Sequence, residues 1–188
     1  MVKASKIILI GGSAGSYSLI AEIIEKLPSY FDAAICIVLH RNKRFETQIE
    51  KNLARKLNKN IISAIDKLDI NKNYIYFAVA GYHLLIEPDF SFSLDSSEHV
   101  NYSRPSIDVL FETAAQIYKD NCVAFLLSGA NSDGAKGLRT IEQFGGEVII
   151  QDPNQASMKA MPLAGERETL NPKIWSNSQI LSYFNTLK

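Results

Sequence analysis

The sequence predicts an α/β fold, namely a three-layer α/β/α, doubly wound domain with a mostly parallel sheet and one antiparallel hairpin. Three observations predict it. Short, wholly apolar runs alternate with segments of helical periodicity along most of the chain. These runs have no polar face, as expected of parallel strands that are buried on both sides. Only the middle of the chain has two adjacent strand-like runs without an intervening helix, which indicates the hairpin.

The first part of the chain contains two complete strand–helix units. Residues 6–10 (KIILI) predict a buried strand, and apolar side chains at helical spacing over residues 19–27 predict a helix that Pro28 ends. Residues 34–39 (AICIVL) predict the second strand. A stripe of period four over residues 45–57 predicts the helix that follows. A short third strand is expected at residues 61–64.

The middle of the chain differs from the rest. Residues 74–79 (YIYFAV) are strand-like. Residues 83–87 and 90–94 flank Pro88 and Asp89, and this arrangement predicts a hairpin. The alternation FSFSL in the second run is typical of a strand with one solvated face, which favours an antiparallel pair.

Strands and helices alternate again in the last part of the chain. Apolar side chains at helical spacing, an N-cap residue, a glycine stop and a proline indicate these elements. The expected elements are a helix with Ser106 as N-cap that reaches about Tyr118, a strand at 122–127, a helix over 135–144, a strand at 147–150, a helix with Pro162 at its first position, and a helix over 179–187.

The composition is that of an ordinary globular chain. The 188 residues are 46% hydrophobic and suit one domain, so residues 1–188 are expected to form a single domain. Lys plus Arg and Asp plus Glu both total 20, so charge gives no reason to expect nucleic acid as a partner. The apolar run at the N-terminus is too short for a signal peptide or a membrane span. A cytoplasmic protein without membrane insertion is therefore expected.

The cysteines and histidines give no indication of a metal site. Cys36 and Cys122 both lie inside apolar runs and are expected to be buried free thiols. The three histidines are scattered, and the sequence has no cysteine cluster. Neither a metal ion nor another cofactor is expected.

Reactive side chains directly follow several of the expected strands. In a doubly wound sheet, ligands bind outside the carboxyl ends of the strands. Ser13 follows the first strand, His40 follows the second, and Asp133 and Asp152 follow two later strands. Separate segments thus bring a nucleophile, a base and carboxylates to one edge of the sheet, which is what acyl transfer requires.

Ser13 lies in the sequence GGSAG at residues 11–15, which fits the pattern G-x-S-x-G. Small residues permit a tight strand-to-helix turn that exposes the serine hydroxyl. Free N–H groups at the start of the following helix, including that of Ala14, would stabilise an oxyanion. A plain turn or a phosphate-binding loop is the alternative. A nucleotide site is disfavoured, because neither a Gly-Lys-Ser/Thr sequence nor the G-x-G-x-x-G spacing is present.

His40 ends a wholly apolar run, at the carboxyl end of its strand. An imidazole at this place can take a proton from Ser13 and return it to a leaving group. His83 and His99 are expected to be structural or merely solvated. The order serine before histidine, with the serine after the first strand, disfavours an ordinary α/β-hydrolase fold, in which the acid lies between the two.

Asp133 belongs to the sequence SGANSDG at residues 128–134, a loop dense in small residues. Such a loop allows the backbone to pass close to a reacting centre. Asp133 would then orient His40. It could instead be the N-cap of the helix that follows, and Asp152 is a competing candidate for the acid.

Several motifs together resemble the catalytic domain of the chemotaxis protein-glutamate methylesterases, over nearly the whole chain. The joint presence of these motifs at their observed separations makes the resemblance specific. They are IGGSAG at 10–15, VLH at 38–40, YFAVAGYHLLIE at 76–87, RPSIDVLF at 104–111, LLSGANSDGAKGL at 126–138, and Met161-Pro162.

The resemblance implies a serine hydrolase that removes methyl esters from glutamate side chains of chemoreceptor-like proteins and can deamidate certain glutamines. By this resemblance Ser13 is the nucleophile, His40 the general base and acid, and Asp133, rather than Asp152, the residue that orients His40. A backbone N–H near the oxyanion is implied at Ala130. The implied partners are a methylated chemoreceptor or a similar signalling protein, and a separate receiver domain or other regulator.

The sequence departs from the family pattern in two places near the site. The family usually has threonine where this chain has Ala14, and Arg41 and Asn42 replace the residues that usually follow the histidine. These departures motivate an alternative, a non-catalytic signalling or scaffold domain of the same descent. Arg41, Lys43 and Arg44 could steer an acidic receptor segment to the site, or could simply form a solvated start of a helix.

Overall fold

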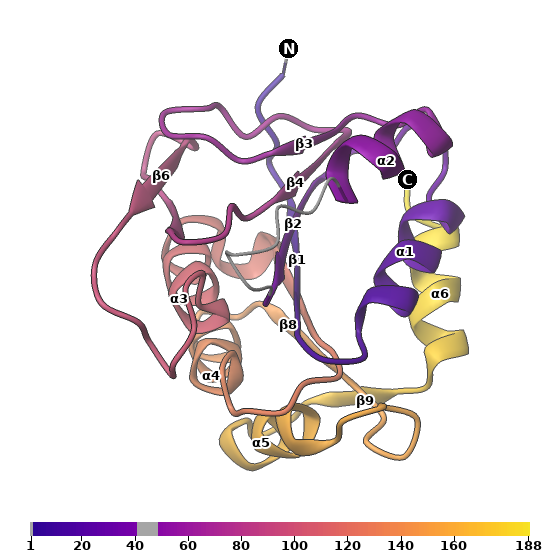
Figure 1. Cartoon of the computed structure of the whole chain (residues 1–188), viewed down its shortest axis with the longest axis vertical. Helices are drawn as coiled ribbons and strands as arrows, with labels where there is room; N and C mark the ends of the chain where they lie inside the picture. The colour runs from indigo at the N-terminus through magenta and orange to yellow at the C-terminus, as the bar shows by residue number, and fades with distance from the viewer. Residues whose placement is uncertain (1, 41–48) are drawn as a thin grey trace.

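The central feature of the molecule is one parallel sheet of seven strands. The computed structural model describes residues 2–40 and 49–188. Figure 1 shows the sheet between two layers of helices. Its strands lie in the order β3 (Ile61–Ser63), β4 (Tyr74–Phe77), β2 (Ala34–Leu39), β1 (Ile7–Gly12), β7 (Cys122–Leu126), β8 (Glu147–Gln151) and β9 (Lys173–Trp175).

The strand order creates a switch point at β1. The strands β2, β4 and β3 lie in this spatial order on one side of β1, although the chain forms β3 before β4, and the chain then returns to build β7, β8 and β9 on the other side. All these strands are parallel, so their carboxyl ends share one edge. Ligand sites in doubly wound sheets lie at such a point. The loops after β1, β2 and β7 are therefore neighbours.

Helices cover both faces of the sheet, and a hairpin extends one of the two layers (Figure 1). One face packs against α1 (Tyr17–Lys26), α2 (Ile49–Leu57) and α6 (Asn177–Asn185). The other face packs against α3 (Ile107–Tyr118), α4 (Ala135–Gln143) and α5 (Ala160–Glu168), with the antiparallel pair β5 (His83–Ile86) and β6 (Phe92–Asp95) beside α3.

The alternation of side chains along β1 divides the core into two halves. Ile8 and Ile10 belong to the half that contains α1 and α6, whereas Ile7 and Leu9 belong to the half that contains α3 and α4. Every residue of β1 and every residue of β2 is buried. A strand covered on both faces has no polar side, which explains the continuous apolar runs of the sequence.

The predicted three-layer α/β/α fold with an antiparallel hairpin is confirmed, and two local expectations need correction. Pro162 does not begin α5, because the helix starts at Ala160 and the proline is its third residue. Proline is tolerated there since the first-turn N–H groups have no partner within the helix. The strand β9 was not expected. It has three residues, of which Lys173 and Ile174 are exposed, so no apolar run marks it.

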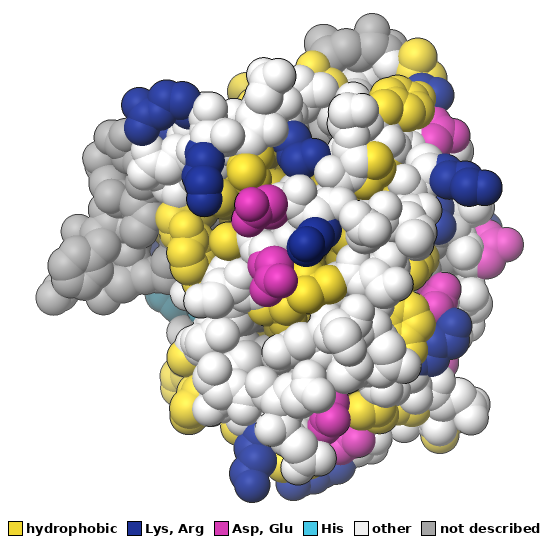
Figure 2. Space-filling view, turned by 90° about the vertical axis from the view of Figure 1, so that its right-hand side faces the viewer, with side chains coloured by type: hydrophobic (Ala, Val, Ile, Leu, Met, Phe, Trp, Pro, Cys, Tyr) yellow, Lys and Arg dark blue, Asp and Glu magenta, His cyan; other side chains and the backbone are white. Residues whose placement is uncertain are grey.

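The structure also bears on the expectations drawn from composition. Cys36 and Cys122 are both buried free thiols, as expected. In the described ranges, no helix has the length and apolar character needed to cross a membrane. Figure 2 shows the face that carries α1 and α6, where described acidic and basic side chains are interspersed rather than gathered by sign.

Candidate active site

The turn after β1 presents Ser13 at the carboxyl edge of the sheet. Its backbone N–H donates to the carbonyl of Ser128 at 2.9 Å, and the carbonyl of Gly12 accepts from the backbone N–H of His40 at 3.0 Å. The turn is thus fixed between the chain segments that leave β2 and β7. The backbone of His40 is thus bound to the residue that precedes Ser13.

The local sequence explains why the turn is tight. Gly15 has a φ of +81°, a left-handed conformation that glycine adopts without strain. The hydroxyl of Ser16 donates to the carbonyl of Ser13 at 2.7 Å and closes the turn where α1 begins. Within the described residues, the Ser13 hydroxyl makes no hydrogen bond, and Ser13 is half-buried.

His40 and Asp133 form the central contact of the site. Nε2 of His40 lies 2.8 Å from Oδ2 of Asp133. The Asp133 side chain is fully buried, and that of His40 is 13% exposed. An ionised carboxylate can only accept, so Nε2 carries the proton and Nδ1 is the basic nitrogen. Nδ1 faces the hydroxyl of Ser103 at 3.4 Å.

The Asp133 carboxylate also accepts hydrogen bonds from the start of α3. The donors are the hydroxyl of Ser106 at 2.7 Å and the backbone N–H groups of Ile107 at 2.7 Å and Asp108 at 3.2 Å. Burial raises the pKa of Asp133, but the hydrogen bonds from His40, Ile107 and Ser106 outweigh it and hold that pKa below its usual range. The residue therefore remains an anion facing His40.

The geometry distinguishes Asp133 from the alternatives that the sequence left open. The N-cap position of α4 is occupied by Gly134, with a φ of +92°, while Asp133 caps α3 instead. Ser106 lies at the N-cap position of α3 as expected, but its side chain does not cap the helix. The carboxylate of Asp152 accepts from the backbone N–H of Asn154 at 2.9 Å and has no hydrogen bond with His40.

Sequence reasoning missed a ring of polar residues around this pair. An Nδ2 hydrogen of Asn101 points to Oδ1 of Asp133 at 3.3 Å. The amide of Asn131 donates to the hydroxyl of Ser103 at 3.3 Å, beside Nδ1 of His40. These residues lie in or beside the motifs RPSIDVLF and SGANSDG, and only this proximity to the motifs could have identified them from the sequence.

The other histidines take no part in the contact between His40 and Asp133. His83 is buried, its Nε2 is 2.9 Å from the carbonyl of Glu98, and its Nδ1 accepts from the backbone N–H of Ser106. It therefore supports the segment before α3. His99 is exposed. The cluster of Arg41, Lys43 and Arg44 lies outside the described residues.

Two backbone N–H groups are free near the Ser13 turn and the loop after β7. Within residues 2–40 and 49–188, the N–H groups of Ala14 and Ala130 donate no hydrogen bond, and both residues are exposed. The loop of Ala130 is fixed by its neighbour Gly129, whose N–H donates to the carbonyl of Met158 and whose carbonyl accepts from the N–H of Met161. In the same described ranges, no cluster of three or more His, Cys, Asp or Glu residues could hold a metal ion.

Comparison with known proteins places these observations in a family. The model of the CheB methylesterase family matches residues 8–183. A protein of Leptospira interrogans described as a putative protein-glutamate methylesterase/protein-glutamine glutaminase is 41% identical over 177 residues, which cover 94% of this chain and 92% of that protein. The corresponding protein of Thermotoga maritima is 31% identical over 162 residues, covering 85% of this chain but 47% of the relative.

A solved structure has the same fold. The crystal structure of the Thermotoga maritima CheB methylesterase catalytic domain superposes with a TM-score of 0.87 at 28% sequence identity. The match covers 96% of this chain and 97% of that domain.

Proposed function

This chain belongs to the CheB methylesterase family and is a protein-glutamate methylesterase by that membership, and we propose that it works through an acyl-enzyme formed on Ser13. The observation that carries the proposal is the 2.8 Å contact between His40 and the buried Asp133, beside the turn of Ser13. A nucleophile, a base and an orienting carboxylate on three adjacent loops are the components of serine hydrolysis.

In the first step, the Oγ atom of Ser13 bonds to the carbonyl carbon of a glutamyl methyl ester. Its proton passes to Nδ1 of His40, since Nε2 already carries the proton that it shares with Asp133. The anionic Asp133 stabilises the imidazolium that results. The carbonyl oxygen becomes an oxyanion, and the free backbone N–H groups of Ala14 and Ala130 are the donors that we assign to it.

In the second step, the bond to the methoxy oxygen breaks and His40 returns its proton, so that methanol leaves and the glutamyl group stays on Ser13. Water then attacks this ester by the same route and releases a glutamate carboxylate. A glutamine side chain would follow the same steps with ammonia as the leaving group. Ala14 does not impair the scheme, because only its backbone N–H takes part.

The partners follow from this substrate. We infer that the substrate is a methylated chemoreceptor or a similar signalling protein, and that a separate receiver domain or other regulator controls the enzyme. Cytoplasmic location remains a prediction. We also infer that residues 1–188 act as one catalytic domain, because every parallel strand joins a single sheet.

The test is methanol release from a methylated receptor fragment. Ser13→Ala should fold like the wild type and release methanol at least about a thousandfold more slowly, as triad variants generally do. Ser18→Ala is the matched control, since Ser18 is exposed on the first turn of α1 and should leave the rate unchanged. Equal rates for Ser13→Ala and the wild type would refute the mechanism.

A further inference from the structure

The side-chain amide of Asn101 donates hydrogen bonds to the carboxylates of both Asp108 and Asp133. Its Nδ2 atom lies 2.7 Å from Oδ2 of Asp108 and 3.3 Å from Oδ1 of Asp133. An amide nitrogen carries two hydrogens, so it can donate to both carboxylates. The orientation of Asn101 relative to Asp133 therefore depends on Asp108.

The N-terminal end of each of the helices α3 and α4 donates hydrogen bonds to a carboxylate that belongs to the other helix or directly precedes it. Asp133, just before α4, accepts from the backbone N–H groups of Ile107 and Asp108 in α3. Asp108, in the first turn of α3, accepts from the backbone N–H of Gly137 in α4 at 2.7 Å. The first turn of a helix has backbone N–H groups without a partner within the helix. Each carboxylate accepts hydrogen bonds from such N–H groups of the other helix. Asp108 thus fixes the turn from which Asp133 projects.

We propose that Asp108 is a positioning residue for ester hydrolysis: through Asn101 and the first turn of α4, it holds Asp133 against His40. This inference rests on the proposed function, in which Asp133 orients His40. Asp108 does not touch His40 or Ser13 in any described contact, so its action is indirect. Asp108 is buried, with an exposed fraction of 3%.

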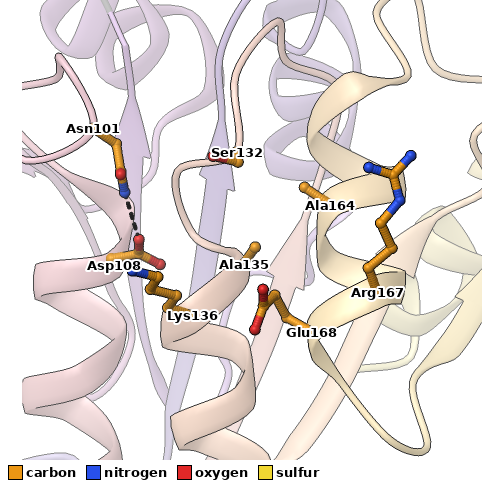
Figure 3. A pocket seen from close by; sticks show the side chains of 8 residues that line it. All are labelled: Asn101, Asp108, Ser132, Ala135, Lys136, Ala164, Arg167 and Glu168. Carbon is orange, nitrogen blue, oxygen red and sulfur yellow. Dashed lines mark hydrogen bonds between the residues drawn. The ribbon is translucent and has the colours of Figure 1, made fainter.

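The charges around Asp108 are consistent with this role. Burial raises the pKa of Asp108, the backbone N–H of Gly137 lowers it, and the negative charges of Asp133 and Glu112 raise it, so that the resulting pKa is about 6. Lys136 is a basic side chain beside Asp108, and Arg167 lines the same cavity (Figure 3). At pH 7.5 Asp108 is therefore mostly ionised and both of its oxygens can accept.

A cavity adjoins the pair formed by Asn101 and Asp108. It has a volume of about 180 Å³, and Figure 3 shows Asn101 pointing at Asp108 on one side and Arg167 and Glu168 across the space. The substitution Asp108→Asn therefore changes hydrogen bonding beside a polar cavity and needs no repacking of apolar side chains. In either orientation of the new amide, a donor faces the N–H of Gly137 or the amide of Asn101.

The experiment compares Asp108→Asn with Glu112→Gln at pH 7.5. Glu112 lies one turn further along α3, and its substitution removes the same charge. Asp108→Asn should lower kcat for methanol release by about tenfold or more with KM within about twofold of the wild type, as expected when a reacting group is misplaced. Glu112→Gln should stay within about twofold of the wild type.

The imidazole of His40 gives a second readout that does not depend on turnover. Ring ¹⁵N spectra should show Nε2 protonated in the wild type and in Glu112→Gln, and a mixture of tautomers in Asp108→Asn. Asn101→Ala should act like Asp108→Asn, and the double variant should be no slower than the slower single variant, because both act on one network. If Asp108→Asn does not fold, Asn101→Ala is measured alone.

Three results would overturn the inference: wild-type kcat together with a wild-type His40 spectrum in Asp108→Asn, an equal loss in Glu112→Gln, or additive losses in the double variant. Loss of activity in Ser13→Ala with none in Asp108→Asn would leave the proposed function standing and refute only the role of Asp108. If the wild type releases no methanol, the proposed function fails, and the His40 spectra still decide whether Asp108 positions Asp133.

Discussion

Nε2 of His40 lies 2.8 Å from Oδ2 of Asp133, although 93 positions separate the two residues in the chain. The sheet order explains this contact. His40 follows β2 and Asp133 lies in the loop after β7, and these two strands flank β1, which ends at the turn of Ser13. Three distant segments therefore meet because their strands are adjacent and parallel.

Asp133 stabilises the fold as well as the site. Asp133→Ala removes the acceptor of Ser106, Ile107 and Asp108 at the start of α3 and leaves buried donors unpaired. We expect the free energy of unfolding at pH 7 to fall by about 3 kcal/mol. Urea denaturation measures this. Asp152→Ala, which loses a contact at the start of a surface loop, should cost about 1 kcal/mol or less. Equal costs would contradict the capping role.

The pH dependence of stability should carry opposite contributions from Asp133 and Asp108. The folded-state pKa of Asp133 is lowered, so its stabilisation is present above the unfolded-state pKa and is lost as the pH falls through the folded-state value. The folded-state pKa of Asp108 is raised to about 6, so the native state keeps that proton longer than the unfolded state. Its contribution therefore declines as the pH rises from 4 to 6.

Asp108→Asn should remove that decline. Between pH 4 and pH 7, its stability relative to the wild type should rise by up to about 3 kcal/mol, because two pKa units correspond to that free energy. Urea denaturation at both pH values measures the difference. A difference between the variant and the wild type that stays constant from pH 4 to pH 7 would show that Asp108 titrates normally.

Gly137 allows α3 and α4 to approach closely. A Cβ atom built there would lie 2.6 Å from Cβ of Phe111 and 3.1 Å from Cα of Asp108. Gly137→Ala should therefore destabilise the protein by about 2 kcal/mol, although alanine usually favours a helix by about 1 kcal/mol. Thermal unfolding measures this, with Lys136→Ala on the exposed side of α4 as a control that should be neutral. A stabilised Gly137→Ala variant would contradict the packing described.

The sequence predicted the fold well because most strands are buried on both faces. Continuous apolar runs mark β1, β2 and β7, and their order along the chain implies the doubly wound topology. The short edge strand β9 has exposed side chains and so left no such mark. Pro162 was misplaced by two residues because proline fits several positions of the first helical turn.

The candidate residues of the site could be predicted only where they directly follow strands or lie in a recognisable motif. Ser13 and His40 each come directly after a strand, and Asp133 lies in a glycine-rich loop. Asn101 could not be predicted, because it acts from an irregular turn where it has a φ of +49° and reaches Asp108 and Asp133 through space. The hydrogen bonds of Asp133 to α3 and of Asp108 to α4 could not be predicted either, because they depend on how the two helices pack.

The most direct test of the central claim is the rate at which a fluorophosphonate probe labels the protein, with the modified residue identified by mass spectrometry. The probe should modify Ser13 in the wild type, and His40→Ala should label at least about a hundredfold more slowly, because the hydroxyl then lacks its base. Labelling at another residue, or labelling of Ser13 at the same rate with and without His40, would contradict the account.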